Sequence, residues 1–291
     1  MIRDFRVMPR ITLRLLLIVV TGIGLSLGWR ANRLFVNRAA IQGLRDEGLS
    51  ASETYESLEY QLSFWTRVNV DRIAVSGAWP FYPDPEKPYN APSKFWEHLS
   101  KLKPLASLEV VGIDVPNDGG DEALPAVTSA SFTLCRFRGN ALADALRRMP
   151  MLKSLDIAHG ELDSPELLFL SRCKHLSEIE IRGIAIPKGT IASLRELSLT
   201  SLFISASGQD RKVEVNQEDI TAISEMTELS RVVIGGNPGF PLASVNVFKK
   251  CKKLTFLRLS VEPSSLEERD AMTSELKKTF PGGDIQLSSP F

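Results

Sequence analysis

The side chains that could do chemistry in this 291-residue chain are few and scattered. They comprise three histidines and three cysteines: His98, His159, His175, Cys135, Cys173 and Cys251. Only Cys173 and His175 lie close together, whereas a metal site needs a larger set of such ligands at a characteristic spacing. The sequence also lacks the GxSxG, P-loop and GxGxxG patterns of common hydrolase and nucleotide sites. We therefore expect no metal and no cofactor.

Two acidic groupings remain as candidates for catalysis or ion binding. Asp156 and His159 fall on adjacent turns, where a carboxylate and an imidazole could serve a hydrolase. Asp118, Asp121 and Glu122 surround a Gly-Gly pair, but the remaining ligands of a calcium loop are missing. We interpret this second group as a polar loop. An unrecognised hydrolase stays as the alternative to a protein without catalytic activity.

A repeated spacing of apolar residues dominates the chain between Val70 and Leu259. Eight times, an apolar residue is followed by two more at +3 and +5. The units begin at Val70, Leu105, Phe132, Leu152, Leu176, Leu194, Leu229 and Leu254. This spacing is typical of leucine-rich repeats, in which each unit buries its apolar edge only against its neighbours. It predicts a scaffold with an extended surface.

Helical patterns separate the apolar units. They cover residues 94–102, 141–148, 165–173, 217–226, 242–250 and 265–278. Strands joined by such returns run parallel. The predicted fold class is therefore α/β, a solenoid of about eight irregular repeats with an open parallel sheet and helical returns. DIQLSS near the C-terminus could add a last strand, and the proline-rich insertion at 79–92 could be a recognition loop or a cap.

Strand alternation predicts which side chains this sheet presents. Positions +3 and +5 point into the core, whereas +2, +4 and +6 lie on the open face. The +4 positions are Ala74, Glu109, Arg136, Asp156, Glu180, Ser198, Val233 and Arg258. The candidate protein-binding residues are Glu109, Arg136, Asp156, Glu178, Glu180, Arg182, Glu196 and Arg258. Alternatively, these charges only pair with one another across strands.

A long apolar segment precedes the repeats. Residues 11–29 hold a single charge, Arg14, and nineteen helical residues span about 28 Å, close to the hydrocarbon thickness of a bilayer. We predict a basic leader at 1–10 and a transmembrane anchor at 11–29, with Trp29 at one interface. A cleaved signal peptide is the alternative, because residues 26–28 resemble a cleavage site.

The anchor carries further expectations. An N-terminus inside the cell would make this a single-pass membrane protein whose repeat domain lies on the extracytoplasmic side. Gly24 and Gly28 form a GxxxG pattern through which two anchors could pair weakly as a homodimer. A short amphipathic helix is expected at 33–47, ending at Gly48.

The net charge of zero conceals a division along the chain. Residues 1–45 carry eight arginines against one aspartate, a net +7, which leaves 27 basic against 34 acidic residues, a net −7, for the remainder. The basic end suits anionic lipid, and the acidic bulk argues against nucleic-acid binding. The three cysteines are odd in number and are interpreted as buried free thiols.

The order of these segments resembles the short-anchored leucine-rich-repeat proteins of planctomycete bacteria. The shared elements are LRLLLIVV, WRANR, AAIQGLRDEG, and VDRIAVSG at the start of the ladder. The resemblance implies a membrane-tethered repeat domain without assigned catalytic residues. We divide the chain into leader, anchor, a juxtamembrane helix and entry region at 30–69, and a repeat domain at 70–291. The expected function is a membrane-anchored protein-interaction module for an unknown protein partner. A hydrolase or a passive envelope protein remains the alternative.

Overall fold

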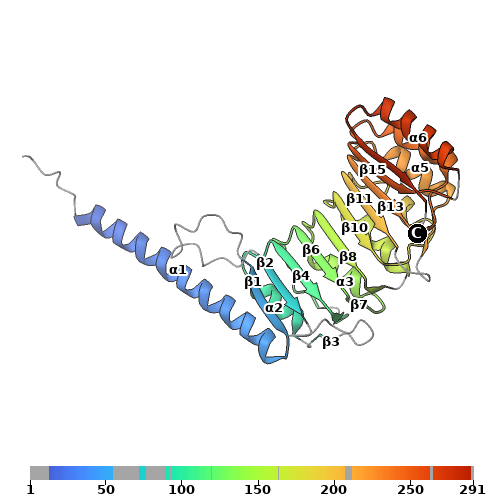
Figure 1. The fold of residues 1–291 in the computed structure, drawn as a ribbon. Coiled ribbons are helices and arrows are strands. Elements are labelled where there is room, and N and C mark those ends of the chain that lie inside the picture. The colour runs from blue at the N-terminus through green and yellow to red at the C-terminus, as the bar shows by residue number, and fades with distance from the viewer. Residues whose placement is uncertain are drawn as a thin grey trace, which may run out of the picture.

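A long curved sheet forms the body of the protein, and helices cover one of its faces (Figure 1). The computed structural model describes residues 13–54, 72–76, 89–91, 94–118, 120–162, 164–206, 212–262 and 265–289. The main sheet contains ten strands in the order β1 (Ser50–Thr54), β2 (Arg72–Ser76), β4 (Ser107–Val111), β6 (Ser129–Thr133), β8 (Ser154–Ala158), β10 (Glu178–Arg182), β11 (Ser201–Ser205), β13 (Arg231–Gly235), β15 (Phe256–Ser260) and β16 (Asp284–Ser288).

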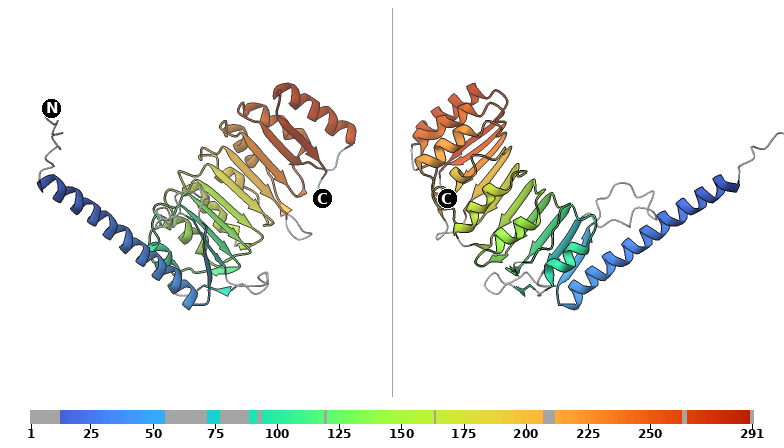
Figure 2. Two further views of the ribbon diagram at one scale, coloured as in Figure 1. Left: turned by 60° about the vertical axis from the view of Figure 1, so that its left-hand side comes forward. Right: turned by 180° about the vertical axis from the view of Figure 1, so that it is seen from behind.

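Neighbouring strands from β2 to β16 are parallel. Each is joined to the next by a return on the same side of the sheet, as the view from behind in Figure 2 shows. The returns contain α2 (Phe95–Lys101), α3 (Ala141–Arg148), η1 (Ser164–Arg172), α4 (Thr190–Ser193), α5 (Gln217–Glu225), η2 (Leu242–Lys250) and α6 (Leu266–Thr279). This is the α/β solenoid with an open parallel sheet that the apolar spacing predicts. The last strand, β16, is also confirmed.

Short strands follow several of the long ones and form two further ladders. One has the order β3 (Tyr89–Asn90), β5 (Ile113–Val115), β7 (Arg136–Phe137) and β9 (Glu161–Leu162). The other pairs β12 (Lys212–Val213) with β14 (Asn237–Pro238). Most repeats therefore contribute a long strand, a turn, an extended segment and a helical return, whereas the described part of the return between β4 and β6 contains no helix. Apolar residues enter the core from several parts of each unit.

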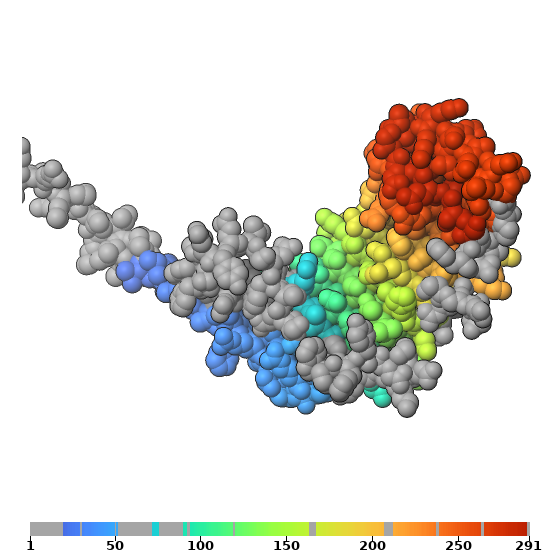
Figure 3. All heavy atoms as spheres, in the orientation of Figure 1, coloured from blue at the N-terminus to red at the C-terminus, as the bar shows by residue number. Residues whose placement is uncertain are grey.

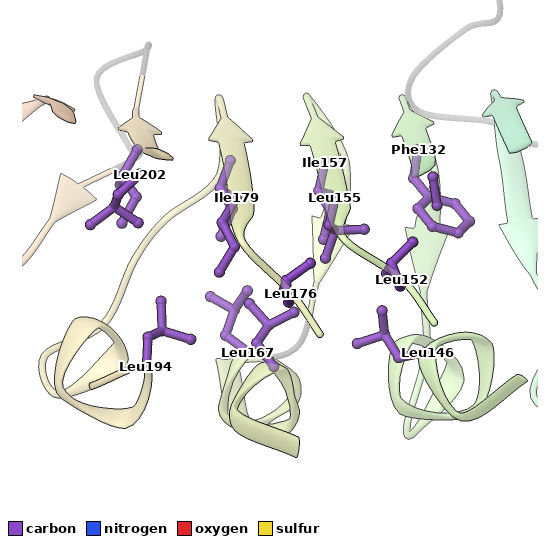
Figure 4. Packing of buried hydrophobic residues seen from close by; sticks show 14 of the residues in the cluster. Phe132, Leu146, Leu152, Leu155, Ile157, Leu167, Leu176, Ile179, Leu194 and Leu202 are labelled. Atoms are coloured by element: carbon purple, nitrogen blue, oxygen red, sulfur yellow. The ribbon is translucent and has the colours of Figure 1, made fainter. Parts of the chain in front are cut away.

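The core lies between the main sheet and the helical layer (Figure 4). On β8, Leu155 and Ile157 both point away from the open face and are buried. Leu167 from η1 and Leu176 before β10 close the same layer from below. Every such layer touches the layers on both sides, which gives one continuous apolar core along the solenoid.

The predicted register was wrong in two repeats. β6 begins at Ser129 and buries Ala130 and Phe132, so its unit starts at Val127 rather than at Phe132. β11 likewise buries Leu202 and Ile204, so its unit starts at Leu199 rather than at Leu194. With these corrections the starts Leu105, Val127, Leu152, Leu176 and Leu199 are 22, 25, 24 and 23 residues apart. The repeat is more regular than the uncorrected spacing suggests.

Cap structures close both ends of the core. At the N-terminal end, β1 pairs antiparallel with β2, and the last turns of α1 (Leu13–Asp46) bury Ala40, Ile41 and Leu44. Gly48, with φ of 88°, follows the end of this helix as predicted, but the short helix expected at 33–47 is continuous with the segment before it. At the C-terminal end, α6 and β16 cover the last repeat. Each end thus shields an apolar edge that has no further repeat beside it.

The ribbon of α1 projects away from the sheet (Figure 1), and residues 20–29 carry their side chains on this projecting part (Figure 3). Val20, Leu25 and Trp29 are 60%, 72% and 60% exposed. Residues 11 and 12 of the expected membrane span lie outside the described part of the chain. Among the helices as the structure describes them, none has a stretch both long and apolar enough to cross a membrane.

Two matched leucine substitutions test the repeat register. Leu155 is 1% exposed on β8, whereas Leu168 on the adjacent η1 is 50% exposed. Leu155→Ala should lower the unfolding free energy by about 2 to 5 kcal/mol, because a buried cavity forms between two neighbouring layers. Leu168→Ala should change it by under about 0.5 kcal/mol. Thermal and denaturant unfolding of both variants measures the difference, and equal losses would contradict the assigned core positions.

Candidate functional site: the open face of the sheet

A continuous row of side chains runs along the middle of the open face. The strand pairings place its members in one line: Ala74, Glu109, Ser131, Asp156, Glu180, Phe203, Val233, Arg258 and Gln286. Four of the predicted binding residues, Glu109, Asp156, Glu180 and Arg258, belong to this row. Glu178 and Arg182 flank it on β10. Six of the predicted residues therefore share the open face.

The other two predicted residues lie elsewhere because of the register error. Arg136 is on the short strand β7, where it forms an ion pair with Glu161 of β9. Glu196 follows α4 on the return side and lies 3.9 Å from the Lys174 ammonium. Ser131 takes the predicted place of Arg136 in the row, and Phe203 takes that of Ser198.

An acidic half of the face spans β4 to β10. Asp156 accepts a hydrogen bond of 2.8 Å from Arg182 and one of 3.2 Å from Ser131. The Arg182 guanidinium also lies 3.1 Å from the Glu180 carboxylate. Charge pairing, the alternative interpretation of these residues, thus explains the positions of Asp156, Glu180 and Arg182. Glu109 and Glu178 are exposed on it, so the net charge of the group stays negative.

A basic and aromatic half spans β11 to β16. Phe256 lies between two guanidinium groups, with Arg231 at 5.2 Å and Arg258 at 5.6 Å from its ring centroid. These distances are those of cation–π contacts. Between this half and the acidic one, Phe203 is half-buried and adds apolar surface, whereas its neighbour Val233 is buried. Both arginines are exposed.

The edge strand β16 bounds this half with polar groups. Gln286 accepts a 3.1 Å hydrogen bond from Arg258 and donates one of 3.1 Å to Asp284. The sequence analysis missed Phe203, Arg231 and Phe256. Arg231 and Phe256 occupy the +2 positions of units whose register was correct, so inspecting that column would have found them. Phe203 required the corrected start at Leu199.

The suggested pairing of Asp156 with His159 does not occur. The hydrogen bonds of Asp156 go to Ser131 and Arg182, whereas His159 is exposed in the turn after β8. His159 has φ of 54°, and Gly112, Leu134 and Gly183 directly after β4, β6 and β10 have φ of 66°, 55° and 62°. A left-handed residue directly after the long strand therefore recurs in these four consecutive repeats. Histidine adopts that conformation more readily than most residues do, so a turn position accounts for His159.

An arginine side chain binds the carboxylates of the acidic loop near Asp118. Arg148, 4% exposed at the end of α3, forms ion pairs with Asp118 and with Glu122, the latter at 2.6 Å. Its guanidinium also lies 5.0 Å from the Trp96 ring centroid. The hydrogen bond from Arg148 lowers the pKa of Glu122 below its usual value. Two of the carboxylates that suggested calcium are therefore satisfied by a side chain that fixes this loop to α2 and α3.

Cys173 and His175 line a hollow of about 470 Å³ between α3 and η1. All three cysteines are free, and Cys135 and Cys251 are buried as predicted, whereas Cys173 is only half-buried. Burial raises the pKa of the Cys173 and Cys251 thiols to about 11 and that of Cys135 to about 12. A nucleophilic cysteine needs a lowered pKa. These thiols are protonated near neutral pH and unsuited to that role.

The strand order and the helical returns define the architecture. It is a leucine-rich-repeat-like fold. No family model and no curated protein matches the sequence. Among solved structures, an internalin from Listeria monocytogenes aligns with 65% of this chain at 17% identity and a TM-score of 0.42. A leucine-rich-repeat protein from Leptospira interrogans aligns with 65% at 18% identity and a TM-score of 0.42. The alignments span about half of each of those chains, 49% and 50%.

Thiol labelling tests the electrostatics of the cysteines. In the native protein at pH 8, a disulfide reagent should modify Cys173 roughly two orders of magnitude more slowly than free cysteine, because a pKa of about 11 leaves little thiolate. The rate should rise nearly tenfold per pH unit until about pH 11. The denatured chain serves as the control, in which all three thiols react rapidly. A native rate that levels off near pH 8.5 would contradict the raised pKa.

Proposed function

We propose that the protein is a membrane-tethered, non-catalytic scaffold whose open sheet face binds another protein. The observation that carries this proposal is the division of that face into an acidic half around Glu178 and Glu180 and a basic, aromatic half around Arg231, Phe256 and Arg258. Complementary charge fixes the orientation of a partner. Arginine is among the side chains that contribute most to binding energy at interfaces, and aromatic residues are enriched there. The expected partner carries basic groups at one end of its contact surface and acidic groups at the other.

The tether is proposed from the N-terminal helix. Its side chains from Val20 to Trp29 are exposed and largely apolar. The order of leader, helix and repeats that resembles planctomycete proteins supports the same arrangement. We place the repeat domain on the extracytoplasmic side. Gly24 and Gly28 have no atom within 4 Å of an added Cβ, which leaves room for weak pairing of two anchors.

Charge reversal on the two halves of the face tests the binding proposal. Glu178→Lys with Glu180→Lys, and separately Arg231→Glu with Arg258→Glu, should each weaken capture of a specific partner by about tenfold or more. All four side chains are on the sheet surface, so the fold should be retained. Affinity capture with the full chain, followed by titration with the purified partner, measures the effect.

The matched control for this experiment is Lys277→Glu with Lys278→Glu. Both lysines are exposed on α6, away from the open face, and their reversal should leave capture unchanged. Equal capture by all variants would remove the sheet face as the binding site. No specific partner for the native chain would favour the passive structural alternative.

Membrane extraction tests the tether. The full chain should stay with membranes through high-salt and carbonate washing, because burial of the apolar helix does not depend on ionic strength. The soluble comparison should begin at residue 32, since Asn37 to Leu44 belong to the cap of the repeat core. It should be washed from the membrane. A mature protein that begins near Trp29 and is free of the membrane would instead establish the signal-peptide alternative.

A further inference from the structure

A hollow of about 560 Å³ lies where α1 passes the end of α2. One wall is α1, with Trp29, Arg33 and Asn37, and the other is the segment from Ser100 to Lys103. The two walls are held together by direct hydrogen bonds. Asn37 exchanges two bonds of 3.2 Å with the backbone of Lys103, and Arg33 donates one of 2.7 Å to the Lys103 carbonyl. The hollow is therefore a fixed feature of the cap.

The charge of this hollow is positive. Arg33, Lys101 and Lys103 line it, and none of its lining residues is acidic, all of them lying in the described part of the chain. The nearest carboxylate that bonds a lining cation is Glu97, which lies 2.6 Å from the Lys101 ammonium on the surface of α2. The Arg33 guanidinium lies 4.9 Å from the Trp29 ring centroid. The Asn37 amide and the Ser100 hydroxyl, which also line the hollow, donate to the backbone carbonyls of Lys103 and Glu97.

The position of the hollow along α1 points to the source of its ligand. On one side of it the helix exposes apolar side chains up to Trp29, and on the other side the helix packs into the repeat cap. A tryptophan marks the boundary between hydrocarbon and headgroups. Arg33 is four residues further on, about 6 Å along a helix. The headgroup layer is about 5 to 8 Å thick on each side of a bilayer, so Arg33 falls at the depth of the lipid phosphates.

We propose that this hollow binds the phosphate headgroup of an anionic phospholipid in the membrane that holds the anchor. The proposal rests on the proposed tether. Arg33 and Lys103 supply the charge and the hydrogen-bond donors, and Trp29 with the exposed Val36 contacts the start of the acyl chains. The bound lipid sits against both α1 and α2 and ties the repeat domain to the membrane surface.

Lipid retention by the full chain tests this site. The protein is purified from mixed phosphatidylcholine and phosphatidylglycerol membranes, and the lipids that remain bound are counted by native mass spectrometry. The native chain should retain one phosphatidylglycerol in preference to phosphatidylcholine. Lys101→Gln with Lys103→Gln should reduce that preference by about fivefold per lysine, and Lys103→Glu should reduce it further. The matched control, Lys250→Gln with Lys252→Gln at the other end of the solenoid, should leave it unchanged.

The outcomes separate the site from the tether. Equal melting temperatures of the variants exclude misfolding, and Lys103→Glu leaves the Lys101–Glu97 ion pair in place. Carbonate resistance without any preference for phosphatidylglycerol would overturn the headgroup site and leave the tether standing. Release of the full chain by carbonate would overturn the tether. Displacement of the bound lipid by millimolar inorganic phosphate would show a general anion site and would also overturn the assignment to lipid.

Discussion

The whole structure depends on contact between neighbouring repeats. Each inner strand of the main sheet forms its backbone hydrogen bonds with the strands on both sides of it. Its buried side chains also pack against those of the neighbouring repeats. A single repeat of about 24 residues could not bury enough apolar surface to fold alone. This constraint explains the caps. The antiparallel strand β1 with the last turns of α1 closes one end, and β16 with α6 closes the other.

Polar contacts between repeats fix the relative orientation of neighbouring helical returns. Asp219, 1% exposed in the first turn of α5, accepts hydrogen bonds from the backbone of Asn216 in its own helix and from Gly189 and Ala192 at the start of α4. Arg148 connects α3 to the loop before it in the same way. A buried charge left without its partners is costly. These contacts therefore fix how one return sits on the next, which the non-directional apolar core alone does not.

The apolar spacing was sufficient to predict the fold class, the parallel sheet and the positions of nearly all the helical returns. The spacing gave the wrong unit start in two repeats, because the apolar pattern fits the sequence there at two different starting residues. Phe132, Cys135 and Phe137 are all buried, because the turn and the short strand β7 also face the core. Ala130, the true core residue of β6, is too small to stand out in a sequence.

The accuracy of the predicted site depended on the accuracy of the repeat register. Six of the eight charges were placed on the open face, whereas Arg136 and Glu196 were displaced by the two errors. β1 was missed because SASET has no apolar pattern, and it pairs there only because β2 offers a free edge. Arg148 was missed because nothing local in the sequence marks a charge as buried. Only the packing of the 118–122 loop against α2 and α3 brings its partners together.

The unbroken course of α1 from Leu13 to Asp46 has a mechanical consequence. The segment from Trp29 to Asp46 is about 26 Å long at the usual helical rise, and its hydrogen bonds to Lys103 allow little hinging. In a tethered protein this segment would be a rigid spacer and not a flexible linker. The repeat domain would then keep to a narrow range of heights above the bilayer and a narrow range of tilt angles. A partner anchored in the same membrane would meet it at a high effective concentration only if its own binding surface reached that height.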